Sequence, residues 1–277
     1  MSNLPPAKKS LGQCFLVESR YAQEIVAALG IRKDDTIVEI GPGRGFLTGE
    51  LLKSPAAKVI AIEIDQRLLS VLQEKYAGEP RFELHHADFV DSDLASLLPQ
   101  GPVKVVGNLP YHLSAEIIYR LLEHARQARH DATLTWIEMA VLMTQKEVAD
   151  RITAGPGTKT YGKLSVFVQL EANAFPVITV PAGAFRPQPK VDGGLIRLDF
   201  LKLPEAYPRD LKTLERVVRY CFHQRRKMLK RTLSSLAGVH PFWQEAKLDF
   251  TRRPETLTLA EWVHLADTIS DQKAPSA

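Results

Sequence analysis

The sequence predicts an α/β fold in which a parallel sheet lies between two layers of helices, followed by a small all-helical domain. Between residues 36 and 107, short apolar runs alternate with segments of helical spacing, which is typical of a parallel sheet with helices on both faces. After a proline-bounded link at 203–208, only helical spacing remains. A chain of 277 residues can bury a large core and does not need disulfides or a metal to fold.

The first two strand–helix pairs are clear in the sequence. The apolar run Thr36–Ile40 (TIVEI) predicts a buried strand that ends at a Gly-Pro-Gly turn, and 45–53 has helical spacing. The run 58–64 (KVIAIEI) predicts a second strand, and Gln66–Tyr76 a second helix with three leucines turned inward.

Further strands follow along the chain. RFELHH at 81–86 and VKVVG at 103–107 predict the third and fourth strands. Later apolar segments predict additional strands within 132–143, at 165–170 and at 195–200.

The division into domains follows the change of pattern. We expect a sheet domain at 1–204, with an N-terminal motif segment at 1–20, and a helical domain at 205–270. The ending 271–277 (DQKAPSA) is expected to be disordered. Apolar residues at helical spacing support the helical domain: Leu211, Leu214, Val217, Val218 and Phe222.

Composition excludes several classes of protein. The two cysteines, Cys14 and Cys221, lie far apart without metal-ligand spacing, which argues against a zinc site or a disulfide framework and suits a reducing cytosol. The N-terminus has no apolar signal region, and no apolar run approaches the roughly 18 residues that a membrane span needs. We therefore expect a cytoplasmic protein that has no metal and does not bind a membrane.

Positive charge is concentrated after the link. Nine basic residues against two acids lie between positions 209 and 231, although the whole chain carries a net charge of only +4. This concentration suggests a polyanionic partner, or else a solvated helical face. The densest group comprises Arg225, Arg226, Lys227, Lys230 and Arg231.

Candidate ligand-binding residues lie at the carboxyl ends of the predicted strands. The motif Glu39-Ile40-Gly41-Pro42-Gly43-Arg44-Gly45 at the end of the first strand is not a dinucleotide fingerprint, because Phe46 stands where that motif needs glycine. Glu63 ends the second strand, where an acid can accept hydrogen bonds from ribose hydroxyls. Asp65 competes for that role, and either carboxylate could instead cap the next helix. Asp88 follows the third strand, where it could accept from an adenine amine or form an Asx turn.

The fourth strand ends in Asn108-Leu109-Pro110-Tyr111. An exocyclic amine of a nucleobase is a poor nucleophile, because its lone pair is delocalised into the ring. The Asn108 side-chain oxygen and the Leu109 backbone carbonyl could accept its hydrogens and localise that lone pair. Pro110 would hold the turn rigid, and Tyr111 would offer a flat face to an unstacked base.

In this order, the segments at 38–48, 61–65, 85–88 and 108–111 resemble the Rossmann-like S-adenosylmethionine-dependent adenine-N6 methyltransferases. The chain is more narrowly similar to the KsgA-type small-subunit (16S) rRNA adenine dimethyltransferases. Further segments resemble that family along nearly the whole length: KKSLGQCFL at 8–16, QKEVADRI at 145–152, YGKLSVFVQ at 161–169, FRPQPKVD at 185–192 and FHQRRKMLKRTL at 222–233.

The resemblance implies roles for individual residues. Phe185 would stack on the target adenine opposite the Asn108, Pro110 and Tyr111 group. The family usually has Asn where this chain has Cys14, and because a thiol is a weak hydrogen-bond partner, only a backbone contact to the cofactor is expected there. The other implied cofactor contacts are Leu16, Gly41, Glu63, Asp88 and Asn108.

The family further implies dimethylation of N6 of two adjacent adenines near the 3′ end of 16S rRNA, in the small ribosomal subunit or its precursor, as a step of ribosome biogenesis. We expect a monomer, because nothing in the sequence suggests an obligate dimer. The basic C-terminal helices would then bind RNA phosphates. Three alternatives stay open: a DNA adenine methylase, a large-subunit rRNA methyltransferase of the antibiotic-resistance type, and a ribosome-assembly factor whose methylation is secondary.

Overall fold

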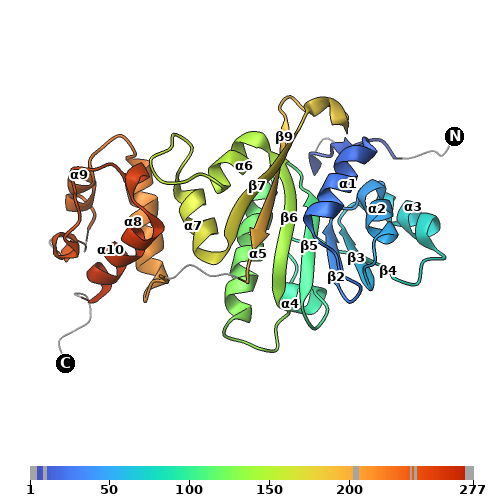
Figure 1. Ribbon diagram of the computed structural model, residues 1–277, viewed down its shortest axis with the longest axis horizontal. Coiled ribbons are helices and arrows are strands. Elements are labelled where there is room, and N and C mark those ends of the chain that lie inside the picture. Colours follow the sequence, from blue (N-terminus) through green and yellow to red (C-terminus); the bar gives the residue numbers. More distant parts are fainter. Residues whose placement is uncertain (1–4, 9–10, 202–205, 238, 240–241, 272–277) are drawn as a thin grey trace. The chain divides into compact units, whose positions relative to one another are not determined.

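The computed structural model describes residues 5–8, 11–201, 206–237, 239 and 242–271 (Figure 1). The chain divides into two compact units, the first formed by Met1–Ala149 with Ala174–Lys202 and the second by Asp150–Asn173 with Leu203–Ala277. The second unit thus includes Asp150–Asn173, which the sequence pattern assigns to the sheet domain. Of the tail expected at 271–277, Asp271 ends a helix, and 272–277 lie outside the described residues.

The first unit is built on a seven-stranded sheet in the order β4-β3-β2-β5-β6-β9-β7. The strands from β4 to β6 in this order are parallel, and β9 runs antiparallel to β6. The α/β fold class is confirmed. The strands are β2 (Thr36–Ile40), β3 (Lys58–Glu63), β4 (Phe82–His86), β5 (Val103–Asn108), β6 (Ile137–Gln145), β7 (Asn173–Val180) and β9 (Gly193–Asp199).

The helices of the sheet domain connect these strands. The sequence predicts α2 and α3 within one residue, but it does not single out α1 or α5. The helices are α1 (Ser19–Ala28), α2 (Phe46–Lys53), α3 (Gln66–Tyr76), α4 (Leu94–Leu97) and α5 (Ser114–Ala128), with α6 (Lys146–Ile152) running from the first unit into the second.

The order of strands reverses between β2 and β5, which places a topological switch point at their carboxyl ends. The two strands approach closely there: a Cβ on Gly107 would lie 2.9 Å from the Ile40 carbonyl oxygen. Only glycine fits this position without moving the backbone. Ligands of open α/β sheets bind in the crevice at such a point.

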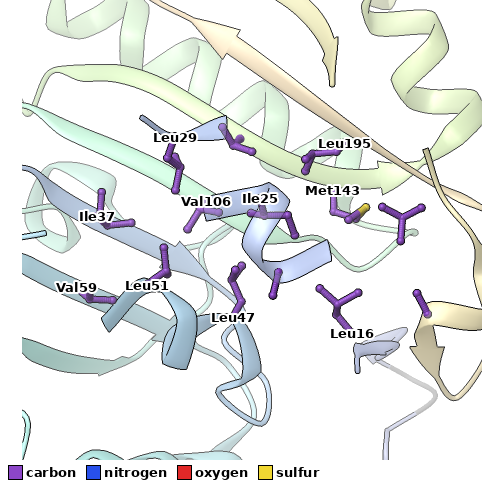
Figure 2. Close-up of a cluster of buried hydrophobic side chains, with 14 of the residues drawn as sticks. Leu16, Ile25, Leu29, Ile37, Leu47, Leu51, Val59, Val106, Met143 and Leu195 are labelled. Carbon is purple, nitrogen blue, oxygen red and sulfur yellow. The ribbon is translucent and has the colours of Figure 1, made fainter. Parts of the chain in front are cut away.

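A hydrophobic core fixes the strands beneath this crevice. Figure 2 shows Ile25 of α1, Leu29 directly after α1, and Leu47 of α2 against the sheet residues Val106 and Met143. These side chains are buried, so α1 and α2 pack against one face of the sheet.

The second unit is helical around an aromatic cluster. Phe222 lies 6.1 Å from Tyr161 and 5.7 Å from Trp262 between ring centroids. Asp210 caps α8 by accepting from the backbone N–H of Lys212. The helices of this unit are α7 (Lys163–Glu171), α8 (Leu211–His223), α9 (Leu229–Ser234) and α10 (Leu259–Asp271).

The strand expected at 165–170 is wrong, because these residues form most of α7. Its Val166, Phe167 and Val168 are typical of a strand, but the helix is buried on nearly all sides. A fully buried helix lacks the polar face that reveals helical periodicity.

Candidate functional site

A cavity opens at the switch point between β2 and β5. Its volume is about 850 Å³ including the open solvent at its mouth. The walls come from the N-terminal segment 11–16, the glycine turn after β2, the end of β3 and the turn after β5. Of the residues proposed for cofactor or base, the lining includes Cys14, Leu16, Gly41, Glu63, Asn108, Leu109, Pro110 and Tyr111.

The glycine turn is shaped by its left-handed backbone and held by α3. Gly41 has φ +68°, and a Cβ there would meet no atom within 4 Å, so a ligand can approach this backbone closely. From α3, Tyr76 donates its hydroxyl to the Gly45 carbonyl at 2.5 Å, and the Lys75 ammonium donates to the Gly45 and Arg44 carbonyls. The turn is therefore fixed without a ligand.

The N-terminal segment forms the opposite wall and is anchored at several points. Its strand β1 (Phe15–Leu16) pairs with β8 (Phe185–Arg186), and the guanidinium of Arg44 lies 4.6 Å from the centre of the Phe15 ring. The Gln13 amide donates to Asp65 Oδ2 at 2.9 Å. The segment is thus held against both the glycine turn and the end of β3.

Glu63 and Asp65 have different surroundings. The Glu63 carboxylate is 3% exposed and accepts from the backbone N–H groups of Gly43 and Asp65 at 3.0 and 2.8 Å. Burial raises its pKa despite these bonds. Each oxygen retains a lone pair that a ribose hydroxyl can use.

Asp65 instead caps α3. It accepts from the backbone N–H of Arg67 and pairs with the Arg67 guanidinium at 2.6 Å. These hydrogen bonds, led by the one from the Arg67 side chain, hold the pKa of this carboxyl well below its usual range. Asp65 is not among the described residues that line the cavity. Of the two acids, Glu63 faces the cavity.

A further carboxyl in the cavity is not identified from the sequence. Glu39 of β2 is 1% exposed, lines the cavity and accepts from the Thr48 hydroxyl at 2.6 Å. Burial raises its pKa to about 7, and the nearby negative charge of Glu63 contributes to the rise. Its only sequence signal is one acid inside the apolar strand TIVEI.

Asn108 has a fixed orientation. Its side-chain Nδ2 donates to the Cys14 carbonyl oxygen at 2.9 Å. Because a carbonyl can only accept, this contact sets which side of the amide carries the nitrogen, and it turns Oδ1 to the other side. The backbone of Cys14, rather than its thiol, makes this contact; burial raises the pKa of that thiol.

The rest of the turn is rigid. The backbone N–H of Leu109 donates to the Met143 carbonyl at 3.0 Å, which ties the turn to β6. The Tyr111 hydroxyl is buried without a hydrogen-bond partner among the described residues, and burial raises its pKa to about 12. Tyr111 thus lines the cavity with a hydroxyl that makes no hydrogen bond to the described residues.

Two residues implied by the resemblance lie apart from the cavity lining. Asp88 Oδ1 accepts from the backbone N–H of Val90 at 2.8 Å, the Asx arrangement considered from the sequence. The Phe185 ring is 0% exposed and belongs to the hydrophobic core, so this conformation presents no face of it to a base. The structure brings Asn108, Leu109, Pro110 and Tyr111 together at the cavity, and not Phe185.

The five basic residues of the densest group, 225–231, differ in exposure. Arg225 is half-buried, and its guanidinium lies 3.6 Å from the Glu255 carboxylate and donates to the Thr158 carbonyl. Both contacts lie within the second unit. The exposed group comprises Arg226, Lys227, Lys230 and Arg231.

Neither a membrane-spanning helix nor a cluster of metal ligands is found in the described part of the chain. No helix there is long and apolar enough to cross a membrane. Within the same residues, no group of three or more His, Cys, Asp or Glu side chains could hold a metal ion.

Comparison with known proteins agrees with this geometry. Among solved structures, a dimethyladenosine transferase from Plasmodium falciparum superposes with a TM-score of 0.73 at 25% identity, covering 91% of this chain and 95% of that one. The 23S rRNA methyltransferase ErmE gives a TM-score of 0.70 at 27% identity, covering 92% and 99%.

Curated relatives are closer in sequence. Ribosomal RNA small subunit methyltransferase A of Pseudomonas aeruginosa is 42% identical over 96% of this chain and 95% of its own length. The protein of the same name from Ligilactobacillus salivarius is 39% identical over 95% and 90%. The family model described as ribosomal RNA adenine dimethylase matches residues 6–271, and the chain belongs to that family.

Proposed function

We infer that this chain transfers methyl groups from S-adenosylmethionine to N6 of adenine in small-subunit ribosomal RNA, where two adjacent adenines near the 3′ end are each dimethylated. Family membership and the curated relatives support the reaction and the class of RNA. The structural observation that carries the proposal is the Asn108 amide, held by the Cys14 carbonyl at the edge of the cavity.

The cavity suits S-adenosylmethionine. The buried Glu63 carboxylate offers acceptors to a ribose, and the open backbone at Gly41 admits close approach. Ile64, 42% exposed and lining the cavity, gives an apolar surface for a flat base. When bound, the cofactor supplies a methyl group on a positively charged sulfur.

Asn108 prepares the nucleophile. Its Oδ1, turned away from Cys14, accepts a hydrogen from the adenine amine, with the Leu109 carbonyl as a second acceptor. Both bonds draw the nitrogen lone pair out of the ring and aim it into the cavity. A neutral amide suffices, since the electrophile already carries positive charge. The turn contributes positioning, which requires reacting atoms about 3–3.5 Å apart.

Tyr111 and the second unit bind the RNA. An adenine that leaves its stack loses a few kcal/mol, and stacking on an aromatic ring such as Tyr111 returns roughly 1–3 kcal/mol per base. We propose that Arg226, Lys227, Lys230 and Arg231, all exposed, bind phosphates without reading sequence. The protein acts in the cytoplasm on the small subunit or its precursor.

Asn108→Ala tests the proposal. We expect single-turnover methylation of small-subunit RNA to slow by roughly two orders of magnitude at saturating cofactor, the usual effect of removing one preorganised hydrogen-bonding group. RNA affinity should change little, because phosphate contacts dominate it. Gln23→Ala, at an exposed position on α1, is the matched control. An unchanged rate in Asn108→Ala would remove this residue from the chemistry.

Measurements of cellular rRNA distinguish the proposed function from its alternatives. Mass spectrometry of 16S and 23S rRNA from cells with and without the gene should show the loss of dimethyladenine in 16S rRNA alone. A loss confined to 23S rRNA would favour the activity that the name of ErmE describes. Full rescue of subunit assembly by Asn108→Ala would favour an assembly factor whose methylation is secondary.

A further inference from the structure

The cofactor cavity contains a second buried carboxyl, to which the proposed function gives no role. Glu39 and Glu63 both line the cavity, and they are 1% and 3% exposed. They lie on adjacent parallel strands, β2 and β3, and each raises the energy of the other when both are ionised.

The neighbours of Glu39 neutralise it only in part. From α2, Thr48 gives one hydrogen bond at 2.6 Å. From α3, the Lys75 ammonium favours the charged form, but it donates its hydrogen bonds to the backbone carbonyls of Arg44 and Gly45. Tyr76, the other titratable group that faces Glu39 from α3, donates to Gly45. A carboxyl so placed exchanges its proton near neutral pH, with its pKa raised to about 7 by burial.

The cofactor and its demethylated product differ in charge. At neutral pH, S-adenosylmethionine carries a sulfonium, an ammonium and a carboxylate, and is a cation overall. Once the methyl group has left, the sulfur is a neutral thioether and the molecule has no net charge. A cation in a low-dielectric cavity favours ionised carboxyls around it, whereas a neutral molecule does so much less.

We propose that Glu39 lets the cavity distinguish the cofactor from its demethylated product by charge: its carboxyl releases a proton to solvent when the cation binds, and takes one back when the neutral product occupies the same place. The inference rests on the proposed function, because it assumes that cofactor. Its consequence is selectivity, since an ionised Glu39 stabilises the cation and leaves the product less tightly held.

Calorimetric titration of the full chain with each ligand, in buffers of different ionisation enthalpy, counts the protons exchanged on binding. Below about pH 7 we expect S-adenosylmethionine to release a proton, approaching one per molecule, and S-adenosylhomocysteine to release almost none. The affinity ratio between the two should rise with pH by up to about tenfold per unit in this window.

Two variants sharpen the test. Glu39→Gln keeps an acceptor for Thr48 and the side-chain volume, and it should abolish both the proton release and the pH dependence of the ratio. Thr48→Val removes the hydrogen bond that favours the charged form, and it should move the release window to higher pH. Glu74→Gln, at an exposed position on α3, should match the parent chain.

The outcomes are distinct. Failure of S-adenosylmethionine to bind would overturn the proposed function itself. Binding without proton release would overturn the role of Glu39 and leave the proposed function intact. Equal release with both ligands would mean that the carboxyl responds to the amino-acid end that they share, and discrimination by charge would be excluded. If Glu39→Gln does not fold, Thr48→Val and the parent chain still decide.

Discussion

Asn108 and Tyr111 belong to one turn but are constrained in different ways. The Asn108 amide is held by a hydrogen bond to the Cys14 carbonyl, so its orientation is part of the fold. The Tyr111 hydroxyl is buried and has no partner among the described residues. The Asn108 side chain is therefore oriented for hydrogen bonding, and the Tyr111 side chain is suited to packing through its ring.

Tyr111→Phe should be nearly silent, because the ring survives and the hydroxyl has no hydrogen-bond partner among the described residues. Tyr111→Ala should slow methyl transfer at saturating RNA by the equivalent of roughly 1–3 kcal/mol, the value of stacking one base. Single-turnover rates beside thermal melts measure both. If the phenylalanine variant is as slow as the alanine variant, the hydroxyl matters and the stacking role is wrong.

The cofactor should depend on Glu63 and not on the charge of Asp65. Glu63→Ala should weaken S-adenosylmethionine binding by about 1–3 kcal/mol, the loss typical of a hydrogen bond to a charged group. Asp65→Asn keeps an acceptor for the α3 cap and should bind nearly normally. Calorimetry decides between them, and the reverse order of effects would move the ribose contact to Asp65.

At the scale of single residues, the sequence identifies most residues of the cavity but cannot show which of two nearby candidates lines it. Glu63 and Asp65 are two positions apart at a strand end, and only the fold shows that one lines the cavity while the other caps a helix. Glu39 cannot be singled out, because an acid inside an apolar strand carries no periodic signal. Phe185 is assigned to the adenine by resemblance alone, whereas its burial depends on the pairing of β1 with β8.

Among the elements, those bounded by a clear turn or cap are predicted well. β2, β3 and β5 end where the apolar runs end, within a residue of the expected bounds, because each is followed by a turn or a cap. The sequence of α7 instead predicts a strand, since its buried residues show no amphipathic spacing. Which elements join which compact unit is a tertiary property, so local pattern cannot predict where Asp150–Asn173 belongs.

The exposed basic residues around α9 should bind RNA and leave the cofactor alone. Changing Lys227, Lys230 and Arg231 to Glu should weaken RNA binding and flatten its salt dependence, with the slope falling by about one for each phosphate that the protein no longer neutralises. Arg225 is left in place because it contacts Glu255 and Thr158 within the unit.

Filter binding at several salt concentrations provides the measurement, and calorimetry with S-adenosylmethionine should show no change. The matched control reverses three exposed basic residues of the sheet domain: Arg20, Lys33 and Lys53. A salt slope that stays the same in the α9 variant, or falls equally in both, would mean that this face is merely solvated.

For the molecule as a whole, the fold class can be predicted because alternation of strands and helices leaves few arrangements.

The free energy of unfolding should depend on pH through one residue, Glu39. Glu39 has a pKa of about 7 in the folded chain against an ordinary 4.5. The folded state keeps this proton longer than the unfolded chain does, so the contribution is fully present below the ordinary value and is lost as pH rises through about 7.

Glu39→Gln, which does not titrate, should therefore stabilise the cofactor-free protein increasingly with pH. At about 1.4 kcal/mol per pH unit, the upper limit is about 3 kcal/mol, reached above neutral pH. Denaturant unfolding of both chains at about pH 5 and about pH 8 measures the difference. A gain that is the same at both values would show that the carboxyl is not protonated in the folded state.

The contact between the Asn108 amide and the Cys14 carbonyl determines what a mutational screen would find at position 14. A main-chain carbonyl is supplied by every amino acid, so a saturation screen that scores each substitution at position 14 should find small and amide side chains interchangeable there. Such a screen would rank the position as dispensable, although the Asn108 amide takes its orientation from it. The dependence would become visible only in variants that displace the backbone, such as a proline introduced within β1, which would cost activity although Cys14 and Asn108 are both unchanged.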